Sequence, residues 1–191
     1  MNENGWMNSF DMERMDTGPQ DPGQVKYQQE RIQHWDDVAT QMDTWSGWGG
    51  YYHRRLAQVY RFLVPPGQKV LELGCGRGDL LAALKPIVGV GIDFSEEILR
   101  RARQRHPGLR FLCADAHTFE LDETFDAILL SDLVNDLWDV QAVLERLRPL
   151  TTPRTRIIIN LYSRLWELPL ALAGKLGLAK PNLYQNWLTV E

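Results

Sequence analysis

The sequence predicts an α/β fold with a mainly parallel sheet and helices on both faces. Five short apolar runs alternate with segments whose apolar residues recur every three or four positions, as on one side of a helix. The first run enters a glycine-rich loop, and the next two are each followed by an aspartate. Because parallel strands bring their carboxyl ends to one edge of a sheet, we expect the loop and both aspartates to lie together. The expected strands are residues 69–73, 87–92, 109–114, 125–131 and 155–161, and the expected helices between them are residues 79–84, 96–105 and 140–147.

Composition limits the possible functions. The 191 residues, 44% of them hydrophobic, are enough for one buried core, so we expect a single domain. The formal net charge of −4 argues against general capture of nucleic acid, which requires clustered lysines and arginines. No apolar run reaches the length of a membrane span or of a signal peptide, which predicts a cytoplasmic protein. Cys75 and Cys113 both fall in expected core elements, so neither a disulfide framework nor a metal site is indicated.

The residues before the first strand are expected to form a leader and a helical cap. Residues 1–24 mix Asn, Asp, Gln, Gly and Pro, which predicts a mobile leader. In the cap, residues 25–66, the apolar stripe of residues 25–42 predicts a helix that either packs on the domain or closes over a ligand. Residues 45–52 hold four aromatic residues and three glycines, which favours a pocket wall or an anchor to the core. The buried face of a second helix is expected at Leu56, Val59, Tyr60 and Leu63.

The glycine-rich loop follows Glu72 and has glycine at every second position, Gly74, Gly76 and Gly78. Glycine lets the backbone turn sharply, so a ligand could lie against bare backbone N–H groups at the start of the next helix. A dinucleotide-binding loop, Gly-x-Gly-x-x-Gly, would need a glycine where the sequence has Asp79. The loop therefore predicts a small-molecule site and disfavours a nicotinamide cofactor.

The order Glu72-x-Gly74-x-Gly76-x-Gly78 resembles motif I of the class I S-adenosylmethionine (SAM) methyltransferases. Three later segments resemble the same family in the same order, and the resemblance covers about residues 50–161. It implies a Rossmann-like fold, SAM as methyl donor and S-adenosylhomocysteine (SAH) as product. A weaker resemblance to bacterial methyltransferase domains found beside a glycosyltransferase implies a saccharide acceptor, as an alternative to another small molecule.

The resemblance also implies roles for single residues. Asp93, at the tip of the second strand, would accept hydrogen bonds from both ribose hydroxyls, and Asp115 would bind the adenine amino group. The segment 131–139 would line the methionine end of the cofactor. The expected cofactor-binding residues are Glu72, Gly74, Cys75, Gly76, Gly78, Asp93, Phe94, Asp115, Ala116 and Ser131.

The sequence indicates the methyl acceptor less specifically than it indicates the cofactor. If the acceptor is a hydroxyl, a general base would help. Many small-molecule members of the family have histidine where this chain has Asp136, and the Pro-Pro-aromatic signature of the enzymes that methylate amino groups of nucleic acids is absent. We therefore expect a small-molecule acceptor and no nucleic acid. The candidate catalytic residues are Asp136, Asp132, His53 and Tyr51.

The sheet of this family usually has seven strands in the order 3-2-1-4-5-7-6, and we find only five. Without the last two, residues 155–161 would form an exposed edge rich in isoleucine. We therefore expect either a part of a longer protein or a homodimer that covers this edge. The SAM-binding core is expected at residues 67–161, followed by a helix and tail at residues 162–191.

Two other functions fit the same residues. The domain could bind SAM or another adenosine ligand as a regulatory or scaffold module without turnover. It could also be an NAD-dependent oxidoreductase, since such enzymes share the acidic residue at the second strand, although Asp79 disfavours this.

Overall fold

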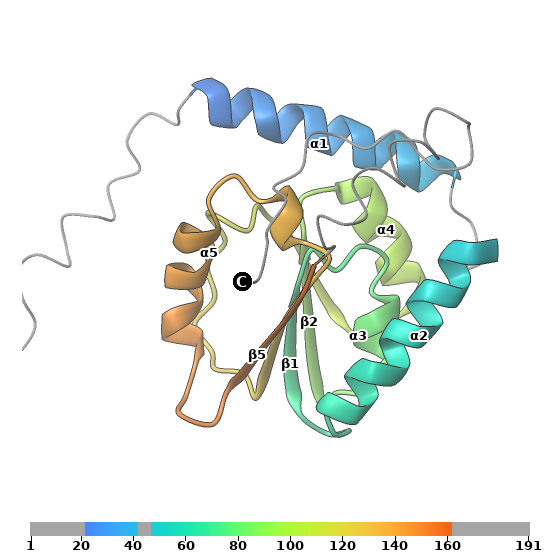
Figure 1. The fold of residues 1–191 in the computed structure, drawn as a ribbon, viewed down its shortest axis with the longest axis vertical. Helices are drawn as coiled ribbons and strands as arrows, with labels where there is room; N and C mark the ends of the chain where they lie inside the picture. Colours follow the sequence, from blue (N-terminus) through green and yellow to red (C-terminus); the bar gives the residue numbers. More distant parts are fainter. Residues whose placement is uncertain (1–21, 42–46, 162–191) are drawn as a thin grey trace, which may run out of the picture.

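The computed structural model describes residues 22–41 and 47–161, and these contain the expected five-stranded parallel sheet (Figure 1). The strand order is β3-β2-β1-β4-β5, and every neighbouring pair is parallel. From β1 the chain first adds β2 and β3 on one side of the sheet and then adds β4 and β5 on the other. The carboxyl ends of β1, β2 and β4 therefore lie side by side. The strands are β1 (Lys69–Leu73), β2 (Val88–Asp93), β3 (Arg110–Cys113), β4 (Ala127–Ser131) and β5 (Arg156–Asn160).

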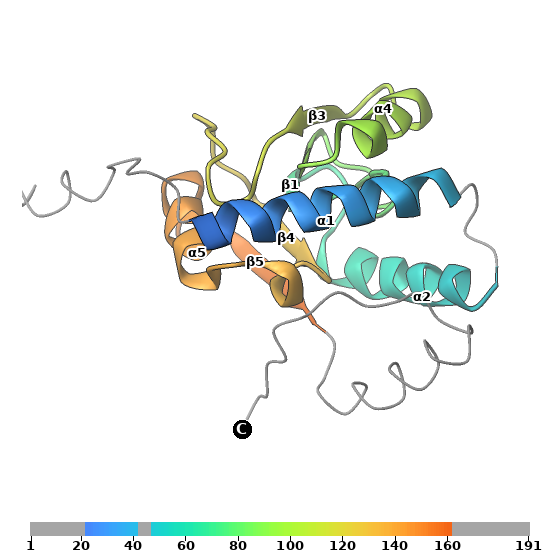
Figure 2. The same cartoon turned by 90° about the horizontal axis from the view of Figure 1, so that it is seen from above.

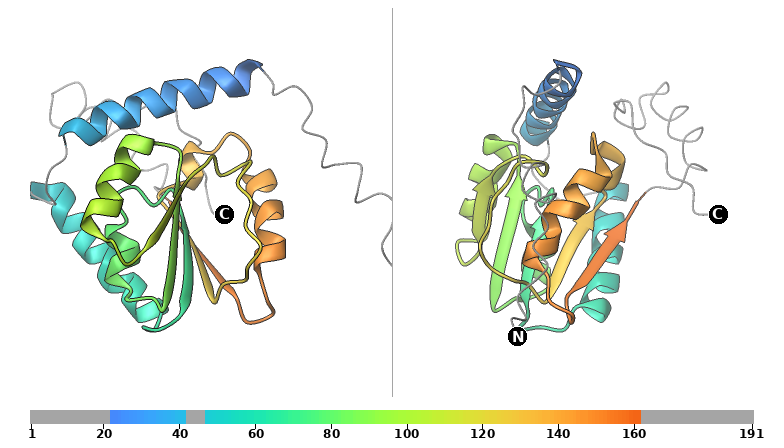
Figure 3. Two further views of the ribbon diagram at one scale, coloured as in Figure 1. Left: turned by 180° about the vertical axis from the view of Figure 1, so that it is seen from behind. Right: turned by 90° about the vertical axis from the view of Figure 1, so that its left-hand side faces the viewer.

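Helices cover both faces of the sheet, as predicted. Figure 3 shows α5 on one face and α2 on the other, and α3 and α4 lie on the same side as α2. The long helix α1 runs across the carboxyl ends of the strands (Figures 1 and 2). The helices are α1 (Pro22–Gln41), α2 (Gly47–Leu63), α3 (Asp79–Ala83), α4 (Glu96–Arg105) and α5 (Val140–Leu147), with short 3-10 turns η1 (Val134–Asp136) and η2 (Arg148–Leu150). Within the described residues no helix has the length and apolar character to cross a bilayer.

The core consists of two apolar layers because the central strands are buried on both sides. Successive side chains of a strand point to opposite faces. In β1, Leu71 belongs to the layer under α5, and Val70 belongs to the layer under α2 and α3. Tyr60 of α2 and Leu147 of α5 are the large side chains that the two helices bury in these layers.

The N-terminal elements begin earlier than expected. Helix α1 starts at Pro22, inside the expected leader, because proline needs no N–H partner in the first turn of a helix. Helix α2 starts at Gly47, so most of the aromatic segment at residues 45–52 is helical. Residues 1–21, 42–46 and 162–191, with the expected leader, the start of the aromatic segment and the expected C-terminal helix, lie outside the described residues.

Two burial predictions and one strand boundary were wrong. Val59 is 45% exposed, because the buried side of α2 runs through Ala57, Tyr60 and Val64 instead. Ile87 is 73% exposed, since β2 begins one residue later. Cys113 is exposed because β3 is the edge strand of the sheet. By contrast, Ser95 caps α4 as expected and accepts a hydrogen bond from the backbone N–H of Ile98 at 3.2 Å.

Candidate functional site

The glycine loop turns at the carboxyl end of β1 through three left-handed residues. Gly74, Gly76 and Gly78 have φ values of +65°, +51° and +71°, which other residues rarely adopt. A side chain at Gly74 would meet Leu133 at 2.9 Å, and one at Gly78 would meet the Phe111 ring at 2.6 Å. At Gly76 it would meet nothing within 4 Å. The loop therefore packs against the protein at its two ends and faces open space at Gly76.

Three of the N–H groups in this loop are not bare, contrary to the expectation. The N–H of Cys75 donates to the carbonyl of Ile92 at 3.0 Å, and the N–H of Gly78 donates to the carbonyl of Cys75 at 2.9 Å. The N–H of Gly76 donates to Asp93 Oδ2 at 2.9 Å. These three donors are used within the protein, whereas a dinucleotide loop must offer its donors to a pyrophosphate. These three N–H groups are therefore not available to a ligand, whereas the space beside Gly76 is open.

Asp93 is the last residue of β2 and is fixed beside the open side of the loop. Its Oδ2 accepts from Gly76, and its Oδ1 accepts from the N–H of Ser95 at 3.1 Å. Only 8% of the residue is exposed. A carboxylate oxygen can accept more than one hydrogen bond, so these two backbone contacts do not by themselves exclude bonds from the hydroxyl groups of a ligand.

Glu72 supplies a second buried carboxyl next to the loop. The residue is 3% exposed, and its Oε2 has no hydrogen-bond partner among the described residues. Burial raises the pKa of this carboxyl well above its ordinary value, and the neighbouring carboxylates of Asp93, Asp79 and Asp132 raise it further. A buried acceptor without a partner carries a free-energy penalty that a cationic or hydrogen-bonding ligand would remove.

Asp115 lies beyond the end of β3 and is held by two residues whose contacts the sequence did not predict. Its Oδ1 accepts from the backbone N–H and the ring Nδ1 of His117, each at 2.7 Å. Its Oδ2 accepts from Nε2 of Gln28 at 3.0 Å. Although burial alone would raise the pKa of Asp115, these bonds hold it below its ordinary value. Because Gln28 belongs to α1, this helix contacts the residue that was expected to bind adenine.

Helix α1 is also attached to the segment after β4. The Arg31 guanidinium lies 3.5 Å from Asp136 Oδ1, and its side chain is 4% exposed. It stacks over the Tyr27 ring at 3.5 Å from the ring centroid, and the Tyr27 hydroxyl donates to the carbonyl of Asp136 at 3.4 Å. Asp136, an expected catalytic candidate, is therefore occupied in holding α1.

Asp132 has the geometry of a better proton acceptor. It follows β4 with φ +56°, an uncommon conformation for a residue other than glycine, and the Tyr52 hydroxyl donates to both its oxygens at 2.8 and 2.9 Å. Asn160, at the end of β5, donates to Asp132 and accepts from the Tyr60 hydroxyl. Burial raises the pKa of Asp132 to about 6, and Asp136 adds to this, while the bonds from Tyr52 and Asn160 oppose it. A carboxyl of this kind changes charge close to neutral pH.

The other two catalytic candidates do not join this group. Tyr51 is 63% exposed, and His53 is exposed. Successive residues of a helix point about 100° apart, so Tyr52 meets Asp132 while Tyr51 points elsewhere. Partial burial and then the nearby Arg77 guanidinium lower the pKa of His53, which lies on the α3 side of α2.

The remaining expected cofactor residues line the same edge through their backbone positions. The Cys75 side chain packs against β2 and is 6% exposed, and burial raises the pKa of its thiol. Phe94 and Ala116 are half-buried and directly follow the two aspartates, and Ser131 ends β4 opposite Asn160 of β5.

The parallel sheet in the order 3-2-1-4-5, with an acidic residue and an open glycine loop at its central edge, has the Rossmann-like fold that is also found in class I methyltransferases. Residues 70–154 match the family model described as a methyltransferase domain. This part of the chain is therefore similar to the class I SAM-dependent methyltransferases, a family that uses SAM as its methyl donor.

Individual methyltransferases are similar to about the same part of the chain. A demethylmenaquinone methyltransferase of Streptomyces griseus is 30% identical over 105 residues, which are 52% of this chain and 44% of that protein. An uncharacterised methyltransferase of Mycobacterium bovis is 35% identical over 119 residues, which are 56% of this chain and 60% of the relative. The structure of the N-methyltransferase NodS of Bradyrhizobium japonicum in complex with SAH has a TM-score of 0.50 at 21% identity and covers 56% of this chain and 60% of NodS. The chain thus spans about half the length of the curated relatives it matches.

Proposed function

We propose that the whole protein transfers a methyl group from SAM to a small-molecule acceptor by in-line displacement. The observation that carries this proposal is the open face of Gly76 between two buried carboxyls, Glu72 and Asp93. SAM bears a positive charge and a ribose diol, and this site offers negative charge and diol acceptors while its loop withholds three backbone donors from an anion. The same observation disfavours an NAD-dependent oxidoreductase.

Each carboxylate of the site would bind a different part of SAM. When bound, SAM supplies a methyl group on a cationic sulfur, which is intrinsically a good electrophile. Asp93 would hold the ribose hydroxyls, Glu72 would accept from the ammonium of the methionine part, and Asp115 would accept from the adenine amino group. Catalysis would then consist mainly of holding the acceptor in line.

Asp132 would take the proton from a hydroxyl acceptor. Its carboxyl is oriented by Tyr52 and Asn160, which come from two different elements. Asp136 is paired with Arg31, and Tyr51 and His53 lie outside the group, so Asp132 is the best placed of the four candidates. We propose a hydroxyl of a small molecule or saccharide as the acceptor, since such a group gains reactivity when it loses its proton.

Binding and turnover measurements test this proposal separately. Calorimetry with SAM, SAH and NAD should give saturable binding of the first two only. Turnover of methyl-labelled SAM with fractionated small-molecule extracts should give a labelled product. Binding of SAM without any labelled acceptor, across extracts that support a known methyltransferase, would favour a regulatory or scaffold module instead. Binding of NAD alone would refute the SAM site.

We also propose that a second copy of the chain covers β5. Among the described strands β5 has one neighbour, β4, and Ile157 and Ile159 are each 41% exposed. An apolar edge strand of this kind promotes association. Light scattering should give the mass of a dimer, and Ile159→Lys should give the mass of a monomer. A cytoplasmic location remains a prediction.

A further inference from the structure

His117 connects the carboxylate of Asp115 to the start of helix α5. Its ring Nδ1 lies 2.7 Å from Asp115 Oδ1, and its Nε2 accepts a hydrogen bond from the backbone N–H of Asp139 at 3.1 Å. Asp139 is the N-cap of α5 and accepts from the N–H of Ala142 at 3.0 Å. The His117 side chain is 9% exposed. Both ring nitrogens therefore have a partner within the protein, on opposite sides of the ring.

These partners define which ring nitrogen of His117 carries the proton. A backbone N–H can only donate, so Nε2 must offer a lone pair to the N–H of Asp139. In a neutral imidazole the proton is then on Nδ1, which donates it to Asp115 Oδ1. The start of α5 thus keeps His117 in the tautomer that donates to the carboxylate.

The segment that carries Asp115 and His117 is also fixed by its backbone. The carbonyl of Asp115 accepts from the N–H groups of Thr118 and Phe119, at 3.1 and 3.0 Å. Arg146 donates to the carbonyl of Phe119 at 3.0 Å, and the Phe119 side chain is buried in the layer under α5. Helix α5 therefore contacts this segment near both of its ends.

The two oxygens of Asp115 have different partners. Oδ1 accepts from the backbone N–H and from Nδ1 of His117, whereas Oδ2 accepts from Gln28 of α1. Burial opposes the charge on Asp115, but the bonds from His117, together with that from Gln28, hold the pKa of this carboxyl below its ordinary value. Because two bonds from one residue restrict rotation of the carboxylate, Oδ2 is held in one direction, toward α1.

We propose that His117 is a positioning residue that orients Asp115 so that its Oδ2 accepts a hydrogen bond from the adenine amino group. This inference rests on the proposed function, since it takes Asp115 as the residue that binds adenine. His117 acts through Asp115 and takes no part in the methyl transfer itself. An acceptor that is already oriented loses less conformational freedom when a donor binds, so the contact with His117 strengthens the selection of an amino group.

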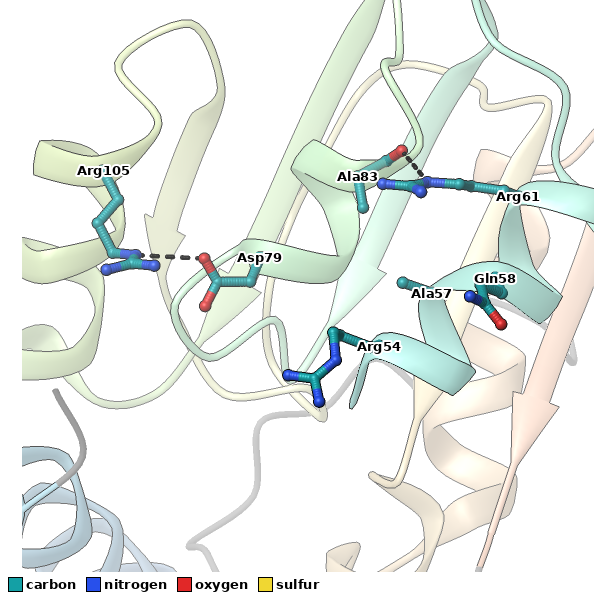
Figure 4. Close-up of a pocket in the computed structure, with 7 residues that line it drawn as sticks. All are labelled: Arg54, Ala57, Gln58, Arg61, Asp79, Ala83 and Arg105. Carbon is teal, nitrogen blue, oxygen red and sulfur yellow. Dashed lines mark hydrogen bonds and ion pairs between the residues drawn. The ribbon is translucent and has the colours of Figure 1, made fainter. Parts of the chain in front are cut away.

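A second contact between a histidine and an aspartate provides a matched control. His106 Nε2 lies 2.9 Å from Oδ1 of Asp79, at the start of α3. Asp79 also pairs with Arg105, and both residues line a cavity of about 460 Å³ between α2 and α3 (Figure 4). His106→Asn shortens the side chain and removes this contact without a change at Asp115.

Two conservative variants separate the two contacts of the His117 ring. The amide nitrogen of His117→Asn takes the place of Nδ1 and can donate to Asp115, whereas the amide oxygen of His117→Gln takes the place of Nε2 and can accept from Asp139. Calorimetry measures the affinity of each variant for SAH and for an SAH analogue whose purine has hydrogen in place of the amino group. The ratio of the two affinities is the amino preference. In the parent chain it should be about tenfold, the scale of one charge-assisted hydrogen bond.

The amino preference should fall to about threefold or less in His117→Gln, and it should stay within about twofold of the parent value in His117→Asn and His106→Asn. An unchanged preference in His117→Gln, or an equal loss in the Asn and Gln variants, would overturn the positioning role although SAH still binds. A parent chain that binds SAH without any amino preference would also overturn it. No binding of SAH to the parent chain would refute the proposed function itself.

A spectroscopic measurement on the unaltered chain tests the orientation without a substitution. Long-range proton–nitrogen NMR spectra distinguish the two neutral tautomers of histidine, and the signals that disappear in His117→Asn assign this ring. His117 should give the pattern of a protonated Nδ1 and an unprotonated Nε2, both before and after SAH is added. A ring protonated at Nε2 alone could not donate to Asp115 and would overturn the proposal.

Discussion

Nε2 of Gln28 lies 3.0 Å from Oδ2 of Asp115, although 87 positions of the chain separate the two residues. The bond places α1 over the carboxylate that is proposed to bind the adenine amino group. Gln28 of α1 and the adenine amino group would therefore compete as hydrogen-bond donors to Asp115.

Gln28→Ala should tighten SAH binding about two- to tenfold, because one net hydrogen bond would no longer have to be exchanged when the cofactor enters. Calorimetry measures the affinity. Gln29→Ala, at the exposed neighbouring position of α1, is the control and should have no effect. Weaker SAH binding by Gln28→Ala would mean instead that Gln28 belongs to the bound state.

Asp93→Ala should weaken SAH binding by about 1.5–3 kcal/mol, the range for hydrogen bonds to a charged group. Part of this loss would come from the Gly76 and Ser95 N–H groups, which lose their acceptor. Asp93→Asn keeps an acceptor for only one of these two N–H groups, because its NH2 replaces the other oxygen, so its affinity should fall while its melting temperature falls less than that of Asp93→Ala. Unchanged affinity in a folded variant would exclude the ribose role.

The loop glycines should respond differently to alanine. Gly76→Ala should cost about 1–2 kcal/mol of folding stability from its left-handed backbone alone, since its side chain has open space. Gly78→Ala adds a collision with the Phe111 ring and should be less stable than Gly76→Ala in urea titrations. Gly76→Val should lose SAH binding, because its side chain fills the open space. Equal stabilities of the two alanine variants would contradict this division.

Turnover should rise with pH through about 6 as Asp132 loses its proton. Its pKa is raised above the unfolded value of 3.8, so the folded state holds this proton more tightly, and stability should fall as pH rises between these values. Asp132→Asn should lower kcat, leave the KM for SAM nearly unchanged and remove this part of the pH dependence of stability. Asp136→Asn should keep the rise near pH 6, and a loss of that rise would reassign the base.

Glu72→Gln should stabilise the protein at neutral pH and weaken SAH binding. Burial raises the pKa of Glu72, so its ionisation opposes folding as pH rises above the ordinary value for a carboxyl. The amide removes that penalty and also the negative charge proposed for the cationic cofactor. Thermal melts from pH 5 to pH 8, beside calorimetry, measure both effects. A destabilised variant with normal affinity would make Glu72 purely structural.

The sheet could be predicted from the sequence because its signals are local. Continuous apolar runs gave each strand to within one or two residues, and the glycine loop and Asp93 lie where strand and loop meet. Contacts across the chain could not be read in this way. Arg31 meets Asp136, and Tyr60 meets Asn160, across 105 and 100 positions. On α2 the sequence pointed to Tyr51 as a candidate, whereas the neighbouring Tyr52 is the residue that reaches Asp132.

The edge position of β3 has a practical consequence. The chain has two cysteines, and Cys75 is buried with a raised thiol pKa, whereas Cys113 is exposed two positions before Asp115. A maleimide fluorophore should therefore label the unmodified chain at a single position. Burial also raises the pKa of Cys113, so labelling should proceed faster at mildly alkaline pH. The emission of that dye would report the binding of adenosine ligands in real time, without any substitution in the site.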